Sequence, residues 1–210
     1  MIFQTRIIYM AYIIYGTGIF SDVLLDEILM DDEQVLAFCL DDNLIDADTH
    51  LDRPLLSFSN VEEFYPPTDV DLLIGITYQK KNETRNAYYQ KGIDKGYSMS
   101  GFVSKNSNIS KKTTIGKNNI ILSGNLIQAG VEIGQNNVLW NTNHIGHHSK
   151  IGDNCFISSH VVISGNCEIG KNAFFGVNST VIDNITIGDY SLIGAGAVVK
   201  EDTIQNQVIK

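Results

Sequence analysis

Three of the chain's five histidines, His144, His147 and His148, lie within five residues of one another. An imidazole can act as a general base near neutral pH, and three imidazoles together can ligate zinc. Which chemistry is available depends on where each side chain points, and therefore on the element that carries it. The residue types alone leave catalysis, metal binding and an ordinary surface cluster open.

Composition narrows the class of protein. The chain has 210 residues, of which 43% are hydrophobic, so it can bury a core of one or two domains. Its net charge of −9 argues against nucleic-acid binding, which favours a basic face. The odd number of cysteines, Cys39, Cys155 and Cys167, without a CxxC pair, indicates free thiols in a reducing cytoplasm.

The apolar run at residues 7–15 is too short to span a bilayer. It leads directly into Gly16 and Gly18, so we interpret it as a first strand and its turn, and expect no membrane insertion. Met10 is a candidate natural start, which would make residues 1–9 an extension.

The second half of the chain is organised by an internal repeat. Ile-Gly pairs recur every 18 residues, at 115–116, 133–134, 151–152, 169–170 and 187–188. Within this period every sixth residue from Val103 to Val199 is large and apolar, over seventeen hexads without an insertion. No helix has this period, so the repeat predicts short strands.

Each hexad position has its own character. Position one, the large apolar residue, is expected to point inward, and position five is mostly small or β-branched. Position four is Asn or Gly, which tolerate positive φ, in eleven of seventeen hexads: Asn106, Asn118, Gly124, Gly130, Asn136, Asn154, Asn166, Asn172, Asn178, Asn184 and Gly196. Position four is therefore a predicted corner. Three hexads close a triangular coil of 18 residues, and stacked coils form a parallel β-helix with about 4.8 Å between strands.

The repeat gives each histidine a place. His148 and His160 fall at corner position four, where histidine is tolerated for its backbone alone, and His144 falls at position six, next to an inward residue. His147 falls at position three, and Gly165 occupies the same position one coil later. A bare glycine backbone beside an imidazole is a geometry for a general base next to an oxyanion donor.

Residues 10–100 show the pattern of a small α/β unit, with strand AYIIY at 11–15, an amphipathic segment at 20–31 and strand VLAFCL at 35–40. Gly16 and Gly18 would let a phosphate approach the turn, although Ser21 stands where a third fingerprint glycine would be. Asp41 and Asp42 lie at a suitable distance for a ribose contact. A structural turn without a ligand is the alternative.

The basic segment 78–101 also has two interpretations. Lys80, Lys81 and Arg85 could contact phosphates, whereas a solvated charged helix is the commoner meaning of such a pattern.

Five features of the chain point to one family: the Gly-rich turn, the strand that leads into Asp41 and Asp42, the segment RPLL at 53–56, the strand DLLIGI at 71–76 and the hexads. Together they resemble PglD/NeuD-type sugar acyltransferases, within the hexapeptide-repeat acetyltransferase superfamily. The resemblance implies an α/β Rossmann-like domain over residues 1–100 that holds a nucleotide-linked sugar. A left-handed parallel β-helix of hexapeptide repeats would follow over residues 101–210.

For the site, the resemblance implies His147 as general base, with His148 beside it, and the amide of Gly165 as oxyanion donor. Acetyl-CoA would lie in the groove between neighbouring helices of a homotrimer, with no metal required. Its expected contacts in this chain are Gly165, Val177, Gly194, Ala195 and Gly196.

The sequence departs from the family at two places. His148 replaces the usual acidic residue after the catalytic histidine, so Asn143, Asp153 or a neighbouring subunit would have to orient His147 if His148 does not. Phe156 stands where the family has a further histidine near the thioester.

The expected function is acetyl transfer from acetyl-CoA to an amino group of a nucleotide-linked sugar, in the cytoplasm, for surface-glycan biosynthesis. Sugar O-acetylation would use the same site. A zinc-dependent enzyme similar to gamma-type carbonic anhydrases and a non-catalytic trimeric sugar-nucleotide binder are the remaining alternatives.

Overall fold

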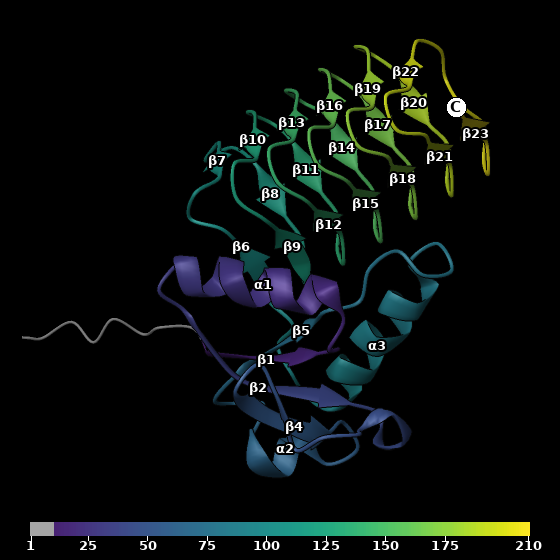
Figure 1. Cartoon of the computed structure of the whole chain (residues 1–210). Coiled ribbons are helices and arrows are strands. Elements are labelled where there is room, and N and C mark those ends of the chain that lie inside the picture. Colours follow the sequence, from purple (N-terminus) through teal and green to yellow (C-terminus); the bar gives the residue numbers. More distant parts are fainter. Residues whose placement is uncertain (1–10) are drawn as a thin grey trace, which may run out of the picture.

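The computed structural model describes residues 11–210. The candidate start at Met10 and the extension 1–9 lie outside the described residues. Figure 1 shows two parts: an N-terminal α/β domain, and a column of stacked coils that rises from it to the C-terminus. The column is a left-handed parallel β-helix that begins with strand β6 at Gly101.

The N-terminal domain is a five-stranded sheet with strand order β3-β4-β2-β1-β5. Its elements are β1 Ala11–Tyr15, α1 Ile19–Met30, β2 Gln34–Leu40, the 3-10 helix η1 Asp42–Leu44, β3 Thr49–His50, β4 Arg53–Ser57, α2 Val61–Phe64, β5 Asp71–Ile74 and α3 Glu83–Asp94. The predicted strands and amphipathic segment correspond to β1, β2, β5 and α1. Strand β1 pairs in parallel with both β2 and β5, so the order of the strands reverses beside β1.

The β-helix has three walls, one for each hexad of a coil. Wall I is made of β6 Gly101–Val103, β9 Asn119–Ile121, β12 Val138–Leu139, β15 Phe156–Ile157, β18 Phe174–Phe175, β21 Leu192–Ile193 and β23 Val208–Ile209. Wall II is made of β7 Asn108–Ile109, β10 Leu126–Ile127, β13 His144–Ile145, β16 Val162–Ile163, β19 Thr180–Val181 and β22 Val198–Val199. Wall III is made of β8 Thr114–Ile115, β11 Glu132–Ile133, β14 Lys150–Ile151, β17 Glu168–Ile169 and β20 Thr186–Ile187.

Three edges join the walls, and hexad position three forms a vertical column along each edge. Edge 1, between walls I and II, carries Ser123, Asn141, Ser159, Val177 and Ala195. Edge 2, between walls II and III, carries Ala129, His147, Gly165 and Asp183. Edge 3, between walls III and I, carries Gln135, Asp153, Lys171 and Asp189.

Backbone conformation confirms position four as the corner. The residues in this position have φ between +51° and +77° in fourteen successive hexads: Asn118, Gly124, Gly130, Asn136, Thr142, His148, Asn154, His160, Asn166, Asn172, Asn178, Asn184, Tyr190 and Gly196. Asn106, which the same reasoning places at a corner, is not among the residues with positive φ. The corners of the repeat are therefore regular from Asn118, the last corner of the first coil, onward.

Two kinds of residue fill the interior. Position-one side chains from Ile121 to Val199 form one continuous buried cluster along the axis. In the coils that precede Cys155, position five carries buried asparagines whose side chains hydrogen-bond from coil to coil. The sequence pattern did not suggest these asparagine ladders. Asn137 Oδ1, for example, accepts from the amide of Cys155 at 2.6 Å, so a buried backbone N–H is satisfied.

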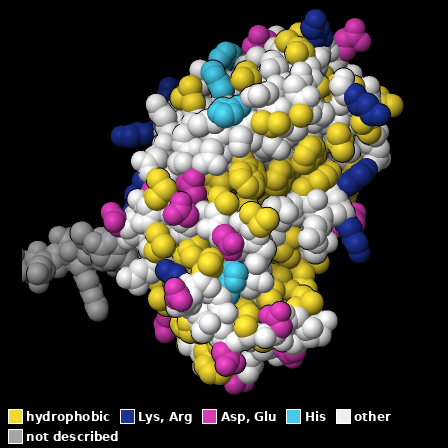
Figure 2. Space-filling view, viewed as in Figure 1, with side chains coloured by type: hydrophobic (Ala, Val, Ile, Leu, Met, Phe, Trp, Pro, Cys, Tyr) yellow, Lys and Arg dark blue, Asp and Glu magenta, His cyan; other side chains and the backbone are white. Residues whose placement is uncertain are grey.

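The N-terminal domain covers wall I. The outward side chains of this wall, including Phe102, Ile120 and Phe156, join those of α1 in a second buried cluster. Figure 2 shows hydrophobic side chains along the seam between the two halves of the molecule. Helix α1 also binds edge 1, where the buried Glu27 carboxylate accepts from the Ser123 amide at 3.0 Å and from Asn141 Nδ2 at 2.6 Å.

Arg85 fixes edge 3 to the same domain. It is fully buried, and its guanidinium donates to the carbonyls of Ile74, Asn118 and Asn136. Burial lowers the pKa of Arg85 to about 9. The suggestion that Arg85 contacts a phosphate is therefore wrong, because its donors serve backbone carbonyls inside the protein. Edges 1 and 3 are both held by the N-terminal domain, whereas edge 2 lies on the opposite side of the prism.

The corner conformation is testable at Asn178, which is exposed and has φ +58°. Asn178→Ala should lower the free energy of unfolding by about 1 kcal/mol, because alanine is strained at this φ, whereas Asn178→Gly should change it little. Urea unfolding followed by circular dichroism measures both variants. Equal stability of the two variants would show that the corner does not demand a left-handed residue.

Candidate functional site

His147 lies on edge 2 with its ring against the backbone of the next coil. A Cβ atom built on Gly165 would lie 2.5 Å from Cε1 and 2.6 Å from Nε2 of His147, closer than any real contact allows. The imidazole therefore occupies space that only a glycine at position 165 leaves open. The amide of His147 donates to Gln128 Oε1 at 2.9 Å, which fixes the backbone below the ring. His147 is exposed, and Gly165 is buried beneath it.

His148 is a corner residue, with φ +57°, and its ring also contacts His147. The two Nδ1 atoms are 3.3 Å apart, and the rings meet edge to face at 74°. A Cβ atom on Gly130, one coil earlier, would lie 2.7 Å from Cδ2 of His148. Each of the two imidazoles therefore rests on a glycine of an adjacent coil, and a shared proton can link them.

The amide of Gly165, the predicted oxyanion donor, already has a partner. It donates to Asp183 Oδ1 at 2.9 Å, and Asp183 is an exposed residue of the same edge, one coil further on. Sequence reasoning missed Asp183, although its place 18 residues after Gly165 in the same hexad position was a signal for it.

The other residues predicted to contact acetyl-CoA lie on edge 1. The amides of Val177 and Ala195 donate to no other group among residues 11–210, and both residues are exposed. Gly176 leaves room beside them, because a Cβ there would lie 2.5 Å from the amide nitrogen of Ala195. Gly194 and Gly196 flank Ala195, and Gly196 has φ +70° with open space around it. Wall II separates these amides from His147 within one chain.

The remaining candidate partners of His147 point elsewhere. Asn143 is buried, with its amide group bonded to Trp140 O and to the amide of Val161. Asp153 accepts from the amide of Gln135 on edge 3. Neither residue orients His147.

Phe156 lies on wall I against the N-terminal domain, stacked on Phe174 at 5.5 Å. His144 stands half-buried on wall II, and His160 is a corner residue of edge 1 with φ +59°. Only His147 and His148 therefore meet on edge 2.

A second candidate region lies in the N-terminal domain. A cavity of about 460 Å³ lies beyond the carboxyl ends of β1 and β5, lined by Gly16, Gly18, Gly75, Tyr88 and Trp140 among others. Parallel α/β sheets bind ligands at this place, where the strand order reverses. Trp140 belongs to wall I, directly before edge-1 residue Asn141, and nothing in the repeat marked it as a cavity residue. Its buried Nε1 has no hydrogen-bond partner among the described residues.

Asp41 and Asp42 do not join Gly16 and Gly18 in this cavity. Asp41 accepts a hydrogen bond from the Tyr88 hydroxyl, and Asp42 accepts from Ser57 and Ser59. Both acids line a separate cavity of about 530 Å³ with Phe58, Lys91 and Lys95. Tyr88, stacked on Tyr15 at 4.0 Å, stands between the two spaces.

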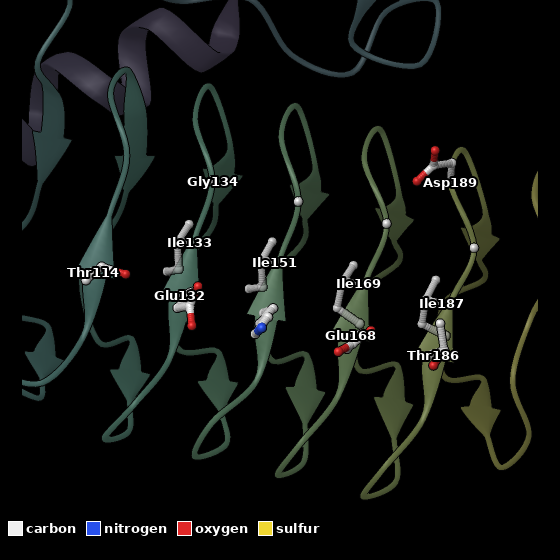
Figure 3. A pocket seen from close by; sticks show the side chains of 14 residues that line it. Thr114, Glu132, Ile133, Gly134, Ile151, Glu168, Ile169, Thr186, Ile187 and Asp189 are labelled. Carbon is white, nitrogen blue, oxygen red and sulfur yellow. The ribbon is translucent and has the colours of Figure 1, made fainter.

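Wall III carries a shallow groove of about 610 Å³ that contains none of the predicted site residues. Figure 3 shows side chains that line it, with Thr114 and Glu132 on β8 and β11, and Glu168 and Thr186 on β17 and β20. Lys150 of β14 lies between the two pairs in the strand order. A column of glycines at position two accompanies them, from four of the five predicted Ile-Gly pairs: Gly134, Gly152, Gly170 and Gly188.

The three cysteines are free and buried. Burial raises the pKa of Cys155 to about 12 and raises the pKa of Cys167 and Cys39 as well, so these thiols are poor nucleophiles at neutral pH. Among residues 11–210 the structure contains no group of three or more His, Cys, Asp or Glu side chains placed to hold a metal. Within the same range, no helix has the length and hydropathy needed to cross a bilayer.

Comparison with known proteins supports the assignment of the fold. The family model described as bacterial transferase hexapeptide (six repeats) matches residues 130–165 and 166–201. Both matched segments lie within the β-helix. The resemblance to hexapeptide sugar acyltransferases is confirmed in repeat and fold, including the α/β domain in front of the hexapeptide domain. No curated protein matches the sequence.

Three solved structures share the architecture of the whole chain. PerB from Caulobacter crescentus, in complex with CoA and GDP-perosamine, is 22% identical, with a TM-score of 0.84 over 95% of this chain and 97% of that one. The acetyltransferase domain of PglB from Neisseria gonorrhoeae, in complex with acetyl coenzyme A, is 17% identical, with a TM-score of 0.82 over 94% of each chain. WeeI from Acinetobacter baumannii is 20% identical, with a TM-score of 0.61 over 95% of each chain.

The packing of His147 on Gly165 is testable by Gly165→Ala. The added methyl group should displace the imidazole, because it would meet the ring at 2.5 Å, while the fold should persist because the ring is the exposed end of a side chain. Imidazole NMR spectra of the variant should show a changed His147 resonance, with His160 on edge 1 as the internal control. An unchanged His147 resonance would contradict the described contact.

Proposed function

We propose that this protein is an acetyl-CoA-dependent acetyltransferase that acts on the amino group of a nucleotide-linked sugar, in surface-glycan biosynthesis. The observation that carries the proposal is the His147 imidazole lying on the bare backbone of Gly165. An imidazole beside a backbone amide supports the proposal, because acyl transfer from a thioester uses a general base and an oxyanion donor.

The active site is shared between protomers of a homotrimer. Two features of one chain support this. The free amides of Val177 and Ala195 lie on edge 1, whereas His147 lies on edge 2, across wall II. The cavity of the N-terminal domain also lies near edge 1, at Trp140. One protomer therefore cannot bring its own acceptor cavity and its own base together.

Wall II has the composition of an interface between two copies of the chain. Its outward position-six residues include no Asp, Glu, Lys or Arg: Asn108, Leu126, His144, Val162, Thr180 and Val198. Leu126, Val162 and Val198 are exposed apolar side chains, and Ile182 is exposed beside them. When three prisms turn wall II toward a common axis, edge 1 of one meets edge 2 of the next. This arrangement brings one protomer's base to the neighbour's amides and cavity.

The residues fit the proposed donor. The pantetheine arm of acetyl-CoA carries amide groups, which pair with backbone N–H groups such as those of Val177 and Ala195. Gly194 and Gly196 keep the surface around Ala195 low enough for such a chain to lie against it. Acetyl-CoA supplies the activated acetyl group, and every other task belongs to the protein.

In the proposed mechanism, Nε2 of His147 removes a proton from the acceptor nitrogen as that nitrogen attacks the thioester carbon. The amide of Gly165 stabilises the oxyanion that forms, once its bond to Asp183 is released. No acyl-enzyme is needed, because the buried Cys155 and Cys167 face the interior and have raised pKa values.

His148 is proposed to orient the base. With Nδ1–H of His147 donating to Nδ1 of His148, Nε2 of His147 keeps a free lone pair toward Gly165. A neutral imidazole then takes the orienting role that a carboxylate has in other base dyads. Gly130 leaves the space in which the His148 ring lies.

The N-terminal cavity is proposed to hold the nucleotide part of the acceptor at Gly16 and Gly18, with the amino end of α1 facing its phosphates. Asp41 and Asp42, which line the neighbouring cavity, would contact it only if Tyr88 moves. A cytoplasmic location agrees with the three free cysteines.

The role of His147 predicts that His147→Ala lowers kcat by roughly 10²–10⁴, the usual contribution of a general base. The assay is thiol release from acetyl-CoA with a panel of UDP-, dTDP-, GDP- and CMP-linked amino sugars. Lys150→Ala, which removes an exposed side chain of wall III, is the control and should keep full activity. Light scattering checks that each variant remains a trimer. Unchanged turnover of the His147→Ala trimer would refute the assignment.

The role of His148 predicts a graded series. His148→Phe removes the hydrogen-bond partner of His147 and should lower kcat by about tenfold, with little effect on the KM for acetyl-CoA. His148→Asn can still accept a hydrogen bond, tolerates the positive φ and should retain more activity. Equal kcat values in both variants and the wild type would leave His148 as a corner residue only.

A further inference from the structure

Asp183 occupies the position that the proposed mechanism requires for the thioester oxygen. Its Oδ1 atom lies 2.9 Å from the amide nitrogen of Gly165, on the edge that carries His147. An oxyanion could use this N–H only after the carboxylate has left it. Because Asp183 is exposed and lies in a turn, its side chain can rotate away without disturbing the core.

The same contact occurs twice on edge 3, away from the histidines. Asp153 Oδ1 accepts from the Gln135 amide at 2.8 Å, and Asp189 Oδ1 accepts from the Lys171 amide at 2.9 Å. An aspartate at position three is therefore a general cap for the amide one coil earlier. What distinguishes Asp183 is its location, because its cap covers the one amide on which the His147 ring also lies.

The negative charge of Asp183 affects amine acceptors and hydroxyl acceptors in opposite ways. An amine acceptor arrives largely as an ammonium, and its tetrahedral intermediate carries a positive nitrogen next to the oxyanion. A hydroxyl acceptor is neutral, and once His147 has taken its proton its intermediate is only negative. A nearby carboxylate attracts the first acceptor and repels the second intermediate.

We propose that Asp183 is a specificity residue of the acceptor site: the thioester oxygen displaces it from Gly165, and its freed carboxylate then pairs with the ammonium group of an amino-sugar acceptor. This inference rests on the proposed function and assigns its acceptor class. Edge 2 carries Lys111 and Lys112 in the first coil and Lys200 in the coil after Asp183, but no lysine or arginine among the described residues forms an ion pair with Asp183.

His147 Nε2 takes one proton from the ammonium, which frees the nitrogen lone pair to form a bond with the thioester carbon. The carbonyl electron pair moves to the oxygen at Gly165 N–H, while the new N⁺H₂ group faces Asp183. Collapse re-forms the C=O bond and breaks the C–S bond. The departing thiolate takes a proton from nitrogen, and His147 releases its proton to water.

The experiment compares Asp183→Asn with the wild type and with Asp189→Asn as a matched control. Asparagine can still cap the amide through its carbonyl oxygen, so both substitutions remove charge and keep the contact. The acceptors are an amino-sugar nucleotide that is active in the panel and its counterpart with a hydroxyl in place of the amine. Thiol release from acetyl-CoA gives kcat/KM for each acceptor.

Asp183→Asn should lower kcat/KM for the amine by roughly tenfold, and leave it unchanged or raised for the hydroxyl. Asp189→Asn should change neither value. An equal change for both acceptors, or no change for either, would overturn the inference while leaving the acetyltransferase function intact. Loss of the proposed function would appear separately, as a wild-type enzyme that transfers acetyl to no acceptor in the panel.

Discussion

The structure depends on stacking coils of 18 residues in strict register. Along the walls, peptide N–H groups pair with backbone carbonyls one coil away, as His144 pairs with Val161 and Gly146 with Ile163. A one-residue slip would break this ladder and turn the apolar position-one side chains outward. Because the register cannot drift, residues 18 apart in sequence become direct neighbours. The chemistry of edge 2 is a consequence of this constraint, since His147, Gly165 and Asp183 meet only through it.

The register also separates tasks among the three edges. Edges 1 and 3 border wall I and are held by the N-terminal domain through Glu27 and Arg85. Edge 2 is left free, with two imidazoles and a carboxylate around one glycine. In the proposed function, His147 faces away from the acceptor cavity of its own protomer. The neighbour's edge 1 would then supply what edge 2 lacks, so the proposed catalysis depends on assembly.

Most of the fold and part of the site could be predicted from sequence, for a physical reason. The period of six, with asparagine or glycine at most corners, reflects the backbone conformation of each coil. The positions of the walls and corners, and the contact between His147 and Gly165, could therefore be predicted by counting residues. Contacts between the two domains do not follow this period, so the repeat does not predict them. The burial of Arg85 under edge 3, the place of Trp140 in the N-terminal cavity and the separation of Asp41 from Gly16 by Tyr88 depend on how two folded halves meet. The cap on Gly165 was within reach, because Asp183 follows the same 18-residue rule.

The central claim is that edge 2 of one protomer and edge 1 of its neighbour form a single reaction centre. A crystal structure of the trimer with bound CoA tests it most directly. The account predicts the CoA sulfur beside Nε2 of His147 in one protomer, with the pantetheine arm on the amides of Val177 and Ala195 in the next. CoA bound along the wall III groove, or held wholly within one protomer away from His147, would contradict it.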